Sequence, residues 1–291
     1  RRGVVKETID RTTDPVLASP LVWIRPPRGW GLANLRELWR SPELIYFLIW
    51  RDVKVRYKQT LLGAGWAILK PFLGMVVFTV VFAGLADLST DGTPPPAFYF
   101  SALLPWVLFQ DGVTKAGNSL VASSNLITKV YFPRMAIPLA LVVAGLVDFA
   151  LSFVVLLGMM AFYRMPLTAA ASLLPLFVGL ALMSALGVGL WLAALNVYYR
   201  DVGYVMPFLL QAWLYASPVV YSTTMIPQGI AGVLYGLNPM AGAVQGFRWA
   251  ITGVGAPPTG LLLTSLLVGL FLLVSGVIVF RRMERAFADI V

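Results

Sequence analysis

The chain has 291 residues, of which 59% are hydrophobic and 12% are charged, and its mean hydropathy is +0.81. A soluble fold cannot bury that much apolar surface, so the composition indicates an integral membrane protein. The sequence contains no cysteine and no histidine, which excludes disulfide frameworks, thiolate nucleophiles and histidine-ligated metals, and we expect no metal site. The basic residues behind the net charge of +9 are confined to particular stretches, which argues against a nucleic-acid partner and for contact with anionic membrane lipids.

The first part of the chain precedes any apolar run. Residues 1–40 are predicted to form a cytoplasmic extension, to which we assign no role. Residues 41–61 are predicted to form an interfacial amphipathic helix, in which Tyr46, Trp50 and Tyr57 share one face beside a basic stripe. The rings and cations could serve only to anchor the helix in the membrane. Alternatively, the rings stack on sugars while the cations hold a phosphate, and both roles are compatible.

Six windows hold the roughly 20 mostly apolar residues that a membrane-spanning helix needs. They are residues 64–86, 98–121, 136–162, 169–195, 203–221 and 259–280, which predicts an all-α membrane domain of six spans over residues 62–291. Eighteen of the 22 Lys and Arg lie in the connections and termini of one side, whereas only Arg164 and Arg248 are assigned to the other. The positive-inside rule then places both termini of a multi-pass membrane protein in the cytoplasm.

The segment before the last span departs from this pattern. Residues 228–237 and 240–251 are apolar but too short to cross a bilayer, so we expect two short re-entrant or interfacial helices separated by a turn at Asn238 and Pro239. Re-entrant backbone needs protein or a water-filled cavity to satisfy its polar groups. The alternative is a folded outer loop.

Four charged residues lie inside predicted spans, where an unpaired charge costs several kcal/mol. Asp111 and Lys115 are four residues apart with the acid first, which favours an ion pair within one helix. Lys70 lies about 10 Å along the helix from Gly63, close enough to help hold a phosphate. Asp148 has no partner nearby in sequence, so it needs a cross-helix bond or a water-filled path.

Leu62 and Gly63 mark the entry to the first span. Helix-start amides there, with Arg56 and Lys58 nearby, favour an anion, which predicts an anion site at this turn. The glycines could instead serve only a tight turn.

Three motifs occur in order on the six-span frame. The first span is entered through Arg56, Tyr57, Thr60, Leu62, Gly63, Trp66, Leu69 and Pro71. Tyr198, Tyr199, Arg200 and Asp201 end the fourth span, and Asn238, Pro239 and Met240 lie before the last span. This arrangement resembles the type-2 ABC exporter permeases, and among them the O-antigen, polysaccharide and teichoic-acid export permeases.

The resemblance implies a permease subunit that exports lipid-linked polysaccharide as a homodimer with two separate ABC ATPase subunits. ATP and Mg would be bound by those partners, with no cofactor in this chain, which has no phosphate-binding loop of its own. It further implies a protein of the bacterial cytoplasmic (inner) membrane with an outer gate at Asn238 and Pro239. By the same resemblance the phosphate of the lipid-linked glycan would be received at Arg56, Lys58, Leu62, Gly63 and Lys70. The coupling surface for the ATPase is expected on a short helix that includes Asn125, Leu126, Lys129 and Tyr131.

Two other functions compete with this one. A type-2 ABC permease for drugs or other lipids is the nearer alternative. A secondary transporter is disfavoured because no internal repeat is evident.

Overall fold

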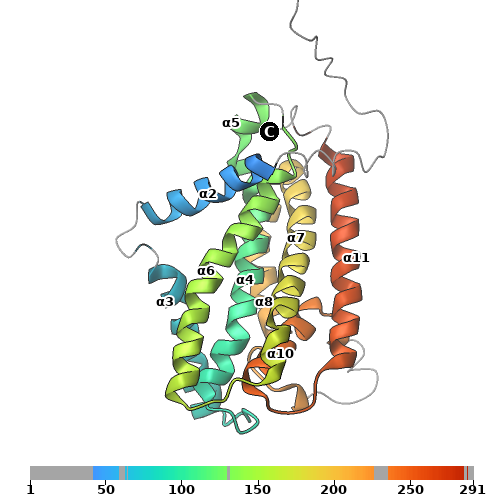
Figure 1. Cartoon of the computed structure of the whole chain (residues 1–291). Coiled ribbons are helices and arrows are strands. Elements are labelled where there is room, and N and C mark those ends of the chain that lie inside the picture. Colours follow the sequence, from blue (N-terminus) through green and yellow to red (C-terminus); the bar gives the residue numbers. More distant parts are fainter. Residues whose placement is uncertain are drawn as a thin grey trace, which may run out of the picture.

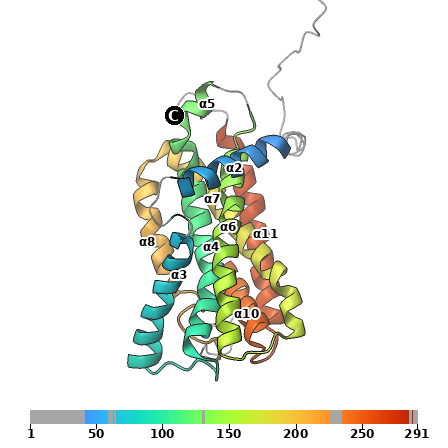
Figure 2. The same ribbon diagram turned by 60° about the vertical axis from the view of Figure 1, so that its left-hand side comes forward.

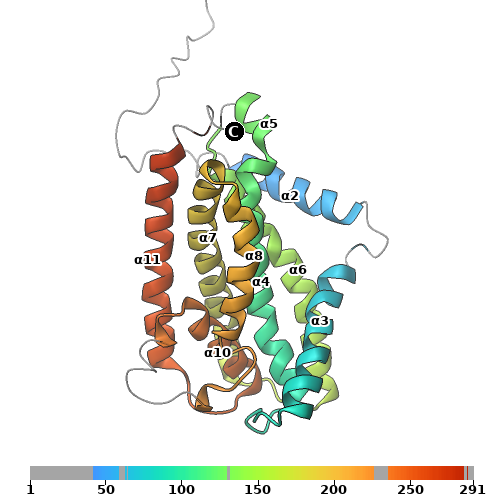
Figure 3. The same ribbon diagram turned by 180° about the vertical axis from the view of Figure 1, so that it is seen from behind.

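The computed structural model describes residues 42–58, 63, 65–129, 132–225, 235–284 and 287, and every regular element in these ranges is helical. In chain order the elements are α2 (Pro42–Lys58), α3 (Gly65–Phe78), the π-helix η2 (Thr79–Leu85), α4 (Pro95–Ala122), α5 (Ser124–Lys129), α6 (Ala136–Phe162), the 3-10 helix η3 (Ala169–Leu173), α7 (Leu174–Tyr198), α8 (Asp201–Tyr215), the 3-10 helix η4 (Thr223–Met225), α10 (Pro239–Thr252) and α11 (Thr259–Glu284) (Figure 1). The long helices run side by side, with α3 and α11 on opposite sides of the bundle (Figures 1 and 3). We call the two ends of the bundle the α5 end and the α10 end.

Four helical segments are long and apolar enough to cross a membrane: Gly65–Leu85, Ala136–Phe162, Ala169–Tyr198 and Thr259–Glu284. They match four of the six predicted windows. Helix α4, with 28 residues, and α8, whose 15 residues rise only about 22 Å, are not among these four segments. The protein is therefore a helical, multi-pass membrane protein, and the number of six spans stays a prediction.

Helix α4 forms the centre of the bundle and packs against α6 and α7. Its buried side chains include Phe98, Phe109 and Trp106, each at most 1% exposed. Helices α7 and α11 approach closely through glycine, because a Cβ added at Gly187 would lie 2.6 Å from the backbone nitrogen of Leu273. Close backbone contact through small residues is how membrane helices gain packing energy without a hydrophobic driving force between them.

Helix α2 lies across the α5 end of the bundle and packs on α6 (Figures 1 and 2). Leu44, Leu48 and Ile49 recur at helical spacing and belong to one apolar cluster with residues of α6 and α7. Tyr46 and Trp50 lie on the side turned away from this cluster and are 69% and 54% exposed. The predicted amphipathic helix is therefore present.

Helix α10 is short and buried at the opposite end of the bundle, against α4, α7 and α11. It corresponds to the second predicted short helix, whereas residues 226–234, most of the first one, lie outside the described part of the chain. Gly253 ends α10 in the left-handed conformation with φ of 67°, which suits glycine. Protein thus surrounds the backbone of α10.

Arg248, counted in the sequence with the connections of the outer side, lies in the second predicted short helix, α10, and is 3% exposed. Its guanidinium donates to the carbonyl of Pro218 at 2.9 Å and to Gln245, and it stands 4.0 Å from the ring centre of Phe98. A buried cation in this setting needs such partners, and the ring face supplies one of them.

Candidate functional site

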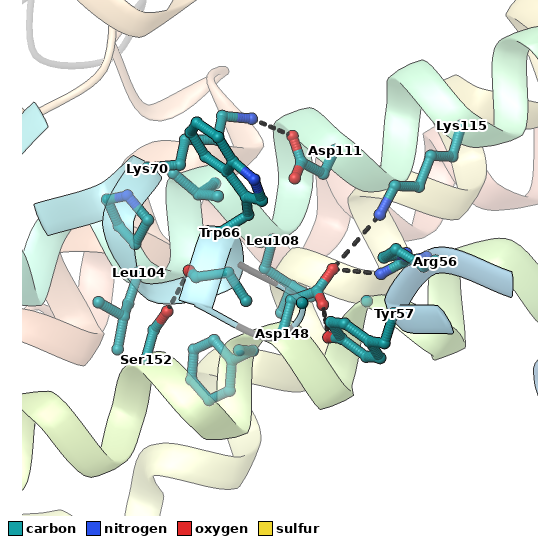
Figure 4. A pocket seen from close by; sticks show the side chains of 16 residues that line it. Arg56, Tyr57, Trp66, Lys70, Leu104, Leu108, Asp111, Lys115, Asp148 and Ser152 are labelled. Atoms are coloured by element: carbon teal, nitrogen blue, oxygen red, sulfur yellow. Dashed lines mark hydrogen bonds and ion pairs between the residues drawn. The ribbon is translucent and has the colours of Figure 1, made fainter. Parts of the chain in front are cut away.

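A cavity of about 310 Å³ opens where the end of α2 meets α3, α4 and α6 (Figure 4). Its charged and polar lining comes from four helices: Arg56 and Tyr57 from α2, Lys70 from α3, Asp111 and Lys115 from α4, and Asp148 and Ser152 from α6. We call it the charged pocket. It unites all four charged residues of the predicted spans with two residues of the amphipathic helix.

Asp148 is the hub of the charged pocket. Its carboxylate accepts hydrogen bonds from Arg56 and from the hydroxyl of Tyr57, and Nζ of Lys115 lies 3.4 Å away (Figure 4). Arg56 also donates to Asp52, one turn earlier on α2. These contacts supply the cross-helix bond that the sequence requires for Asp148, and they tie α2 and α4 to α6.

The hydroxyl of Tyr57 acts as a hydrogen-bond donor in this network. Burial, helped by the hydrogen bond to Asp148, raises the pKa of Tyr57 to about 12. The phenol therefore stays protonated across the physiological range and keeps donating to the carboxylate.

The predicted ion pair between Asp111 and Lys115 is not the one that the structure shows. Oδ1 of Asp111 lies 2.5 Å from Nζ of Lys70 on α3, whereas Lys115 turns to Asp148 on α6. Helix α4 packs against both α3 and α6, so each of its two charges meets an opposite charge from a neighbouring helix. Two cross-helix pairs replace one pair within a helix.

The cations predicted to hold a phosphate differ in their availability. Arg56 already has two carboxylate partners, and its side chain is only 22% exposed. Lys58 at the end of α2 is exposed, and the side chain of Lys70 is 50% exposed. Arg56 thus has a structural role as well, because it fastens α2 to the bundle.

Gly63 borders the charged pocket with φ of 50°, a conformation that favours glycine. The carbonyl of Gly63 accepts a hydrogen bond from Trp66 at 3.4 Å, as a turn into α3 requires. Leu62 lies outside the described residues, so the predicted anion site at this turn stays a prediction.

The three rings predicted to stack on glycan do not form one surface. Tyr46 and Trp50 are exposed on the outer side of α2, and neither borders the pocket. Tyr57 is partly buried, and its hydroxyl is engaged by Asp148. Of these three rings, only that of Tyr57 can therefore contact a ligand inside the charged pocket.

The remaining predicted sites lie at the two ends of the bundle. Helix α5 projects from one end of the bundle (Figure 1). Asn125 is exposed, and Leu126 packs against an apolar cluster. The side chain of Lys129 and all of Tyr131 lie outside the described part of the chain. Asn238 caps α10: its side chain accepts from the backbone nitrogen of Met240 at 3.0 Å, as an N-cap does. It also accepts from Nε1 of Trp213 on α8 at 2.9 Å, so Asn238 and Pro239 form a junction between α8 and α10.

Sequence reasoning missed Ser152. Its hydroxyl donates to the carbonyl of Ala67 at 2.8 Å and joins α6 to the first turn of α3. The available signal is its position four residues after Asp148, which places both on one face of α6.

Comparison with known proteins identifies the family. The family of ABC-2 type transporters matches residues 43–252 of this chain, from α2 to the last turn of α10. The chain belongs to this family. As an ABC-2 type transporter it is a transmembrane subunit and not itself the catalyst, so the resemblance drawn from the three motifs is confirmed and the secondary-transporter alternative is set aside.

Three relatives of this ABC-2 type transporter carry the same name, O-antigen export system permease protein RfbA. The one from Myxococcus xanthus is 30% identical over 257 residues, which cover 88% of this chain and 98% of the relative. Two from Klebsiella pneumoniae are 25% and 24% identical over 249 residues, which cover 85% of this chain and 95% of each relative. The similarity therefore extends over nearly the whole length of these relatives.

Proposed function

We propose that this ABC-2 type transporter exports lipid-linked polysaccharide, of the O-antigen, capsular or teichoic-acid kind, across the bacterial cytoplasmic membrane. The observation that carries the proposal is the full-length similarity to permeases named for O-antigen export. The charged pocket supports it, because a pocket with Arg56, Lys70 and Lys115 beside an interfacial helix suits the phosphate of a membrane-anchored substrate.

The proposed orientation in the membrane rests on the Lys and Arg residues at the two ends. Among the described residues, those at the α5 end include Arg51, Lys54, Lys58, Arg134 and Arg200, whereas the connections at the α10 end carry Arg164. By the positive-inside rule the α5 end faces the cytoplasm, together with both termini. The charged pocket then receives its substrate from the cytoplasmic side.

Energy would come from partner chains. We expect two copies of this permease to assemble with two ABC ATPase subunits, which bind ATP and Mg. Helix α5 is the candidate coupling helix, because it projects at the cytoplasmic end and its exposed Asn125 is available for contact. Asn238 and Pro239, at the opposite end, would belong to the outer gate.

In this proposal the carboxylates hold the cations until substrate arrives. Three carboxylates neutralise three cations inside a membrane protein, where bare cations are costly: Asp52, Asp111 and Asp148 pair with Arg56, Lys70 and Lys115. An entering phosphate can replace a carboxylate as the partner of Lys70, whose side chain is the most exposed of the three. Release of that contact would prepare the pocket for the next substrate.

Deletion of the gene tests the proposal. We expect polysaccharide to vanish from the cell surface, lipid-linked precursor to accumulate on the cytoplasmic side, and a plasmid copy to restore export. Unchanged surface polysaccharide, with altered efflux of drugs or altered lipid composition instead, would overturn the proposal in favour of the drug or lipid permease alternative.

A further inference from the structure

A second cavity, of about 590 Å³, lies between α3 and α6 toward the α10 end. Its lining includes Met75, Val76 and Val80 on one side and Val155, Met159 and Phe162 on the other. We call it the apolar groove. Of the polar side chains beside it, Thr79 contributes a hydroxyl and Tyr163 a phenol.

The charged pocket and the apolar groove follow one another along the same pair of helices. On α6, Asp148 and Ser152 line the pocket and Val155, Met159 and Phe162 line the groove. These residues are spaced by four, three, four and three, which places them on a single helix face. The last lies 14 positions after the first, which corresponds to about 21 Å of helix.

Helix α3 shows the same order. Ala67 and Pro71 of α3 line the charged pocket, and Met75 of α3 and Thr79, the first residue of η2, line the apolar groove. Consecutive members of this set are one turn apart, so each lies beside the next along the helix. Between them, α3 and α6 form a seam that is charged toward the α5 end and mostly apolar toward the α10 end.

This polarity matches an amphiphile with an anionic head and a long hydrocarbon chain. A lipid in the cytoplasmic leaflet has its head at the interface and its chain directed toward the middle of the bilayer. Arg56, Lys70 and Lys115 would meet such a head group, and the groove would continue in the direction of the chain.

We propose that the seam between α3 and α6 binds the lipid carrier of the exported glycan, with its phosphate in the charged pocket and its hydrocarbon chain in the apolar groove. The inference rests on the proposed function, because it assigns a place to the carrier lipid of that substrate. It makes α3 and α6 part of substrate recognition in addition to α2.

Gly158 allows the groove to be filled without disturbing the fold. It lies on α6 in the wall of the groove, and a Cβ placed on it meets no heavy atom within 4 Å. Gly179 on α7 is exposed in the same way but borders neither cavity, so it is a matched control. Leucine at either position raises helix propensity by the same amount.

The first experiment compares Gly158→Leu with Gly179→Leu in cells that depend on this chain for export. We expect Gly158→Leu to lower export about tenfold at normal complex yield, because it excludes roughly two methylene groups of the hydrocarbon chain from the groove. Gly179→Leu should export normally. Normal export by Gly158→Leu, in cells where deletion abolishes export, would overturn the seam and leave the proposed function standing. If deletion itself leaves export intact, the proposed function fails instead.

The second experiment separates the carrier from bulk membrane lipid. The complex with its ATPase is placed in lipid nanodiscs and irradiated with ultraviolet light in the presence of one of two probes. One probe is a polyprenyl diphosphate that bears a diazirine on its chain, and the other is phosphatidylethanolamine that bears the same group. We expect the polyprenyl probe to label peptides around residues 155–162 and 75–80, and Gly158→Leu to reduce this labelling. Equal labelling by both probes, or polyprenyl adducts mainly on α11, would show that the groove holds only bulk lipid and would overturn the proposal.

Discussion

The phenol of Tyr57, near the end of the amphipathic helix α2, donates a hydrogen bond to Asp148, 91 residues later in the membrane-spanning helix α6. Arg56 joins the same carboxylate, so two consecutive residues hold α2 against the bundle. The helix that would first meet a lipid-linked substrate is thus fastened by the charged pocket. Entry of an anion into that pocket and the position of α2 should therefore be coupled.

Tyr57→Phe should loosen α2, because it removes a hydrogen bond to a charged acceptor. Folding raises the pKa of Tyr57 from 10.0 to about 12, so the stability that the phenol contributes is complete below pH 10 and is lost as the pH rises toward 12. The melting temperature of the purified complex should fall over this interval in the wild type and less in Tyr57→Phe. Tyr46→Phe, at an exposed position of the same helix, should behave as wild type. Identical pH profiles for all three proteins would contradict the role of Tyr57.

Lys70 and Asp111 should rescue one another when their charges are exchanged. Lys70→Asp alone places two acids together, so complex yield should fall. Adding Asp111→Lys should restore the yield. The coupling free energy between the two positions should be about 1 kcal/mol, since Lys70 is half exposed. The matched comparison exchanges Asp111 and Lys115, the pair expected from sequence. Better rescue by that exchange would show that the cross-helix pairing is wrong.

Lys58→Gln should reduce export without loosening α2. Lys58 is exposed at the end of the helix, and one charge-assisted phosphate contact is worth about 1.5–3 kcal/mol, which corresponds to a loss of at least tenfold. Arg56→Gln should lower both export and thermal stability, because Arg56 also binds Asp52 and Asp148. Export in cells is measured against complex yield, with Lys54→Gln as the control on the same helix. Full export by Lys58→Gln would mean that this cation serves only to anchor α2 to the membrane.

Arg248→Ala should destabilise the α10 end by about 2–3 kcal/mol, since it removes the cation over Phe98 and leaves the carbonyl of Pro218 without this donor. The readout is the melting temperature of the purified complex. Arg164→Ala, at an exposed turn of the same end, is the control and should have little effect. Equal melting temperatures for the two variants would argue against a structural role for Arg248.

The orientation is tested with single cysteines, because the natural chain contains none. A membrane-impermeant maleimide should label Ser89→Cys only from outside the cell, since it lies in the connection before α4 at the α10 end. Ser123→Cys, between α4 and α5, should react only in inverted vesicles. The reverse pattern at either site would turn the proposed topology around.

The sequence by itself determined the membrane character of the chain, the positions of its apolar helices and the amphipathic character of α2. These features depend on local composition and on the spacing of side chains along one helix, which are visible in any stretch of 20 residues. The same reasoning found the short helix before the last span, because its apolar run is too short to cross a bilayer.

Only the tertiary structure decided which charges meet. Asp111 and Lys115 are the natural pair within one helix, yet Lys70 and Asp148 lie closer to them across the helix contacts. The same holds for Arg248, which lies in a predicted short helix, because only the structure shows that its guanidinium is buried against Phe98 and Pro218. Coulomb attraction depends on distance in space, and that distance is set by the packing of helices whose residues lie up to 92 positions apart along the chain.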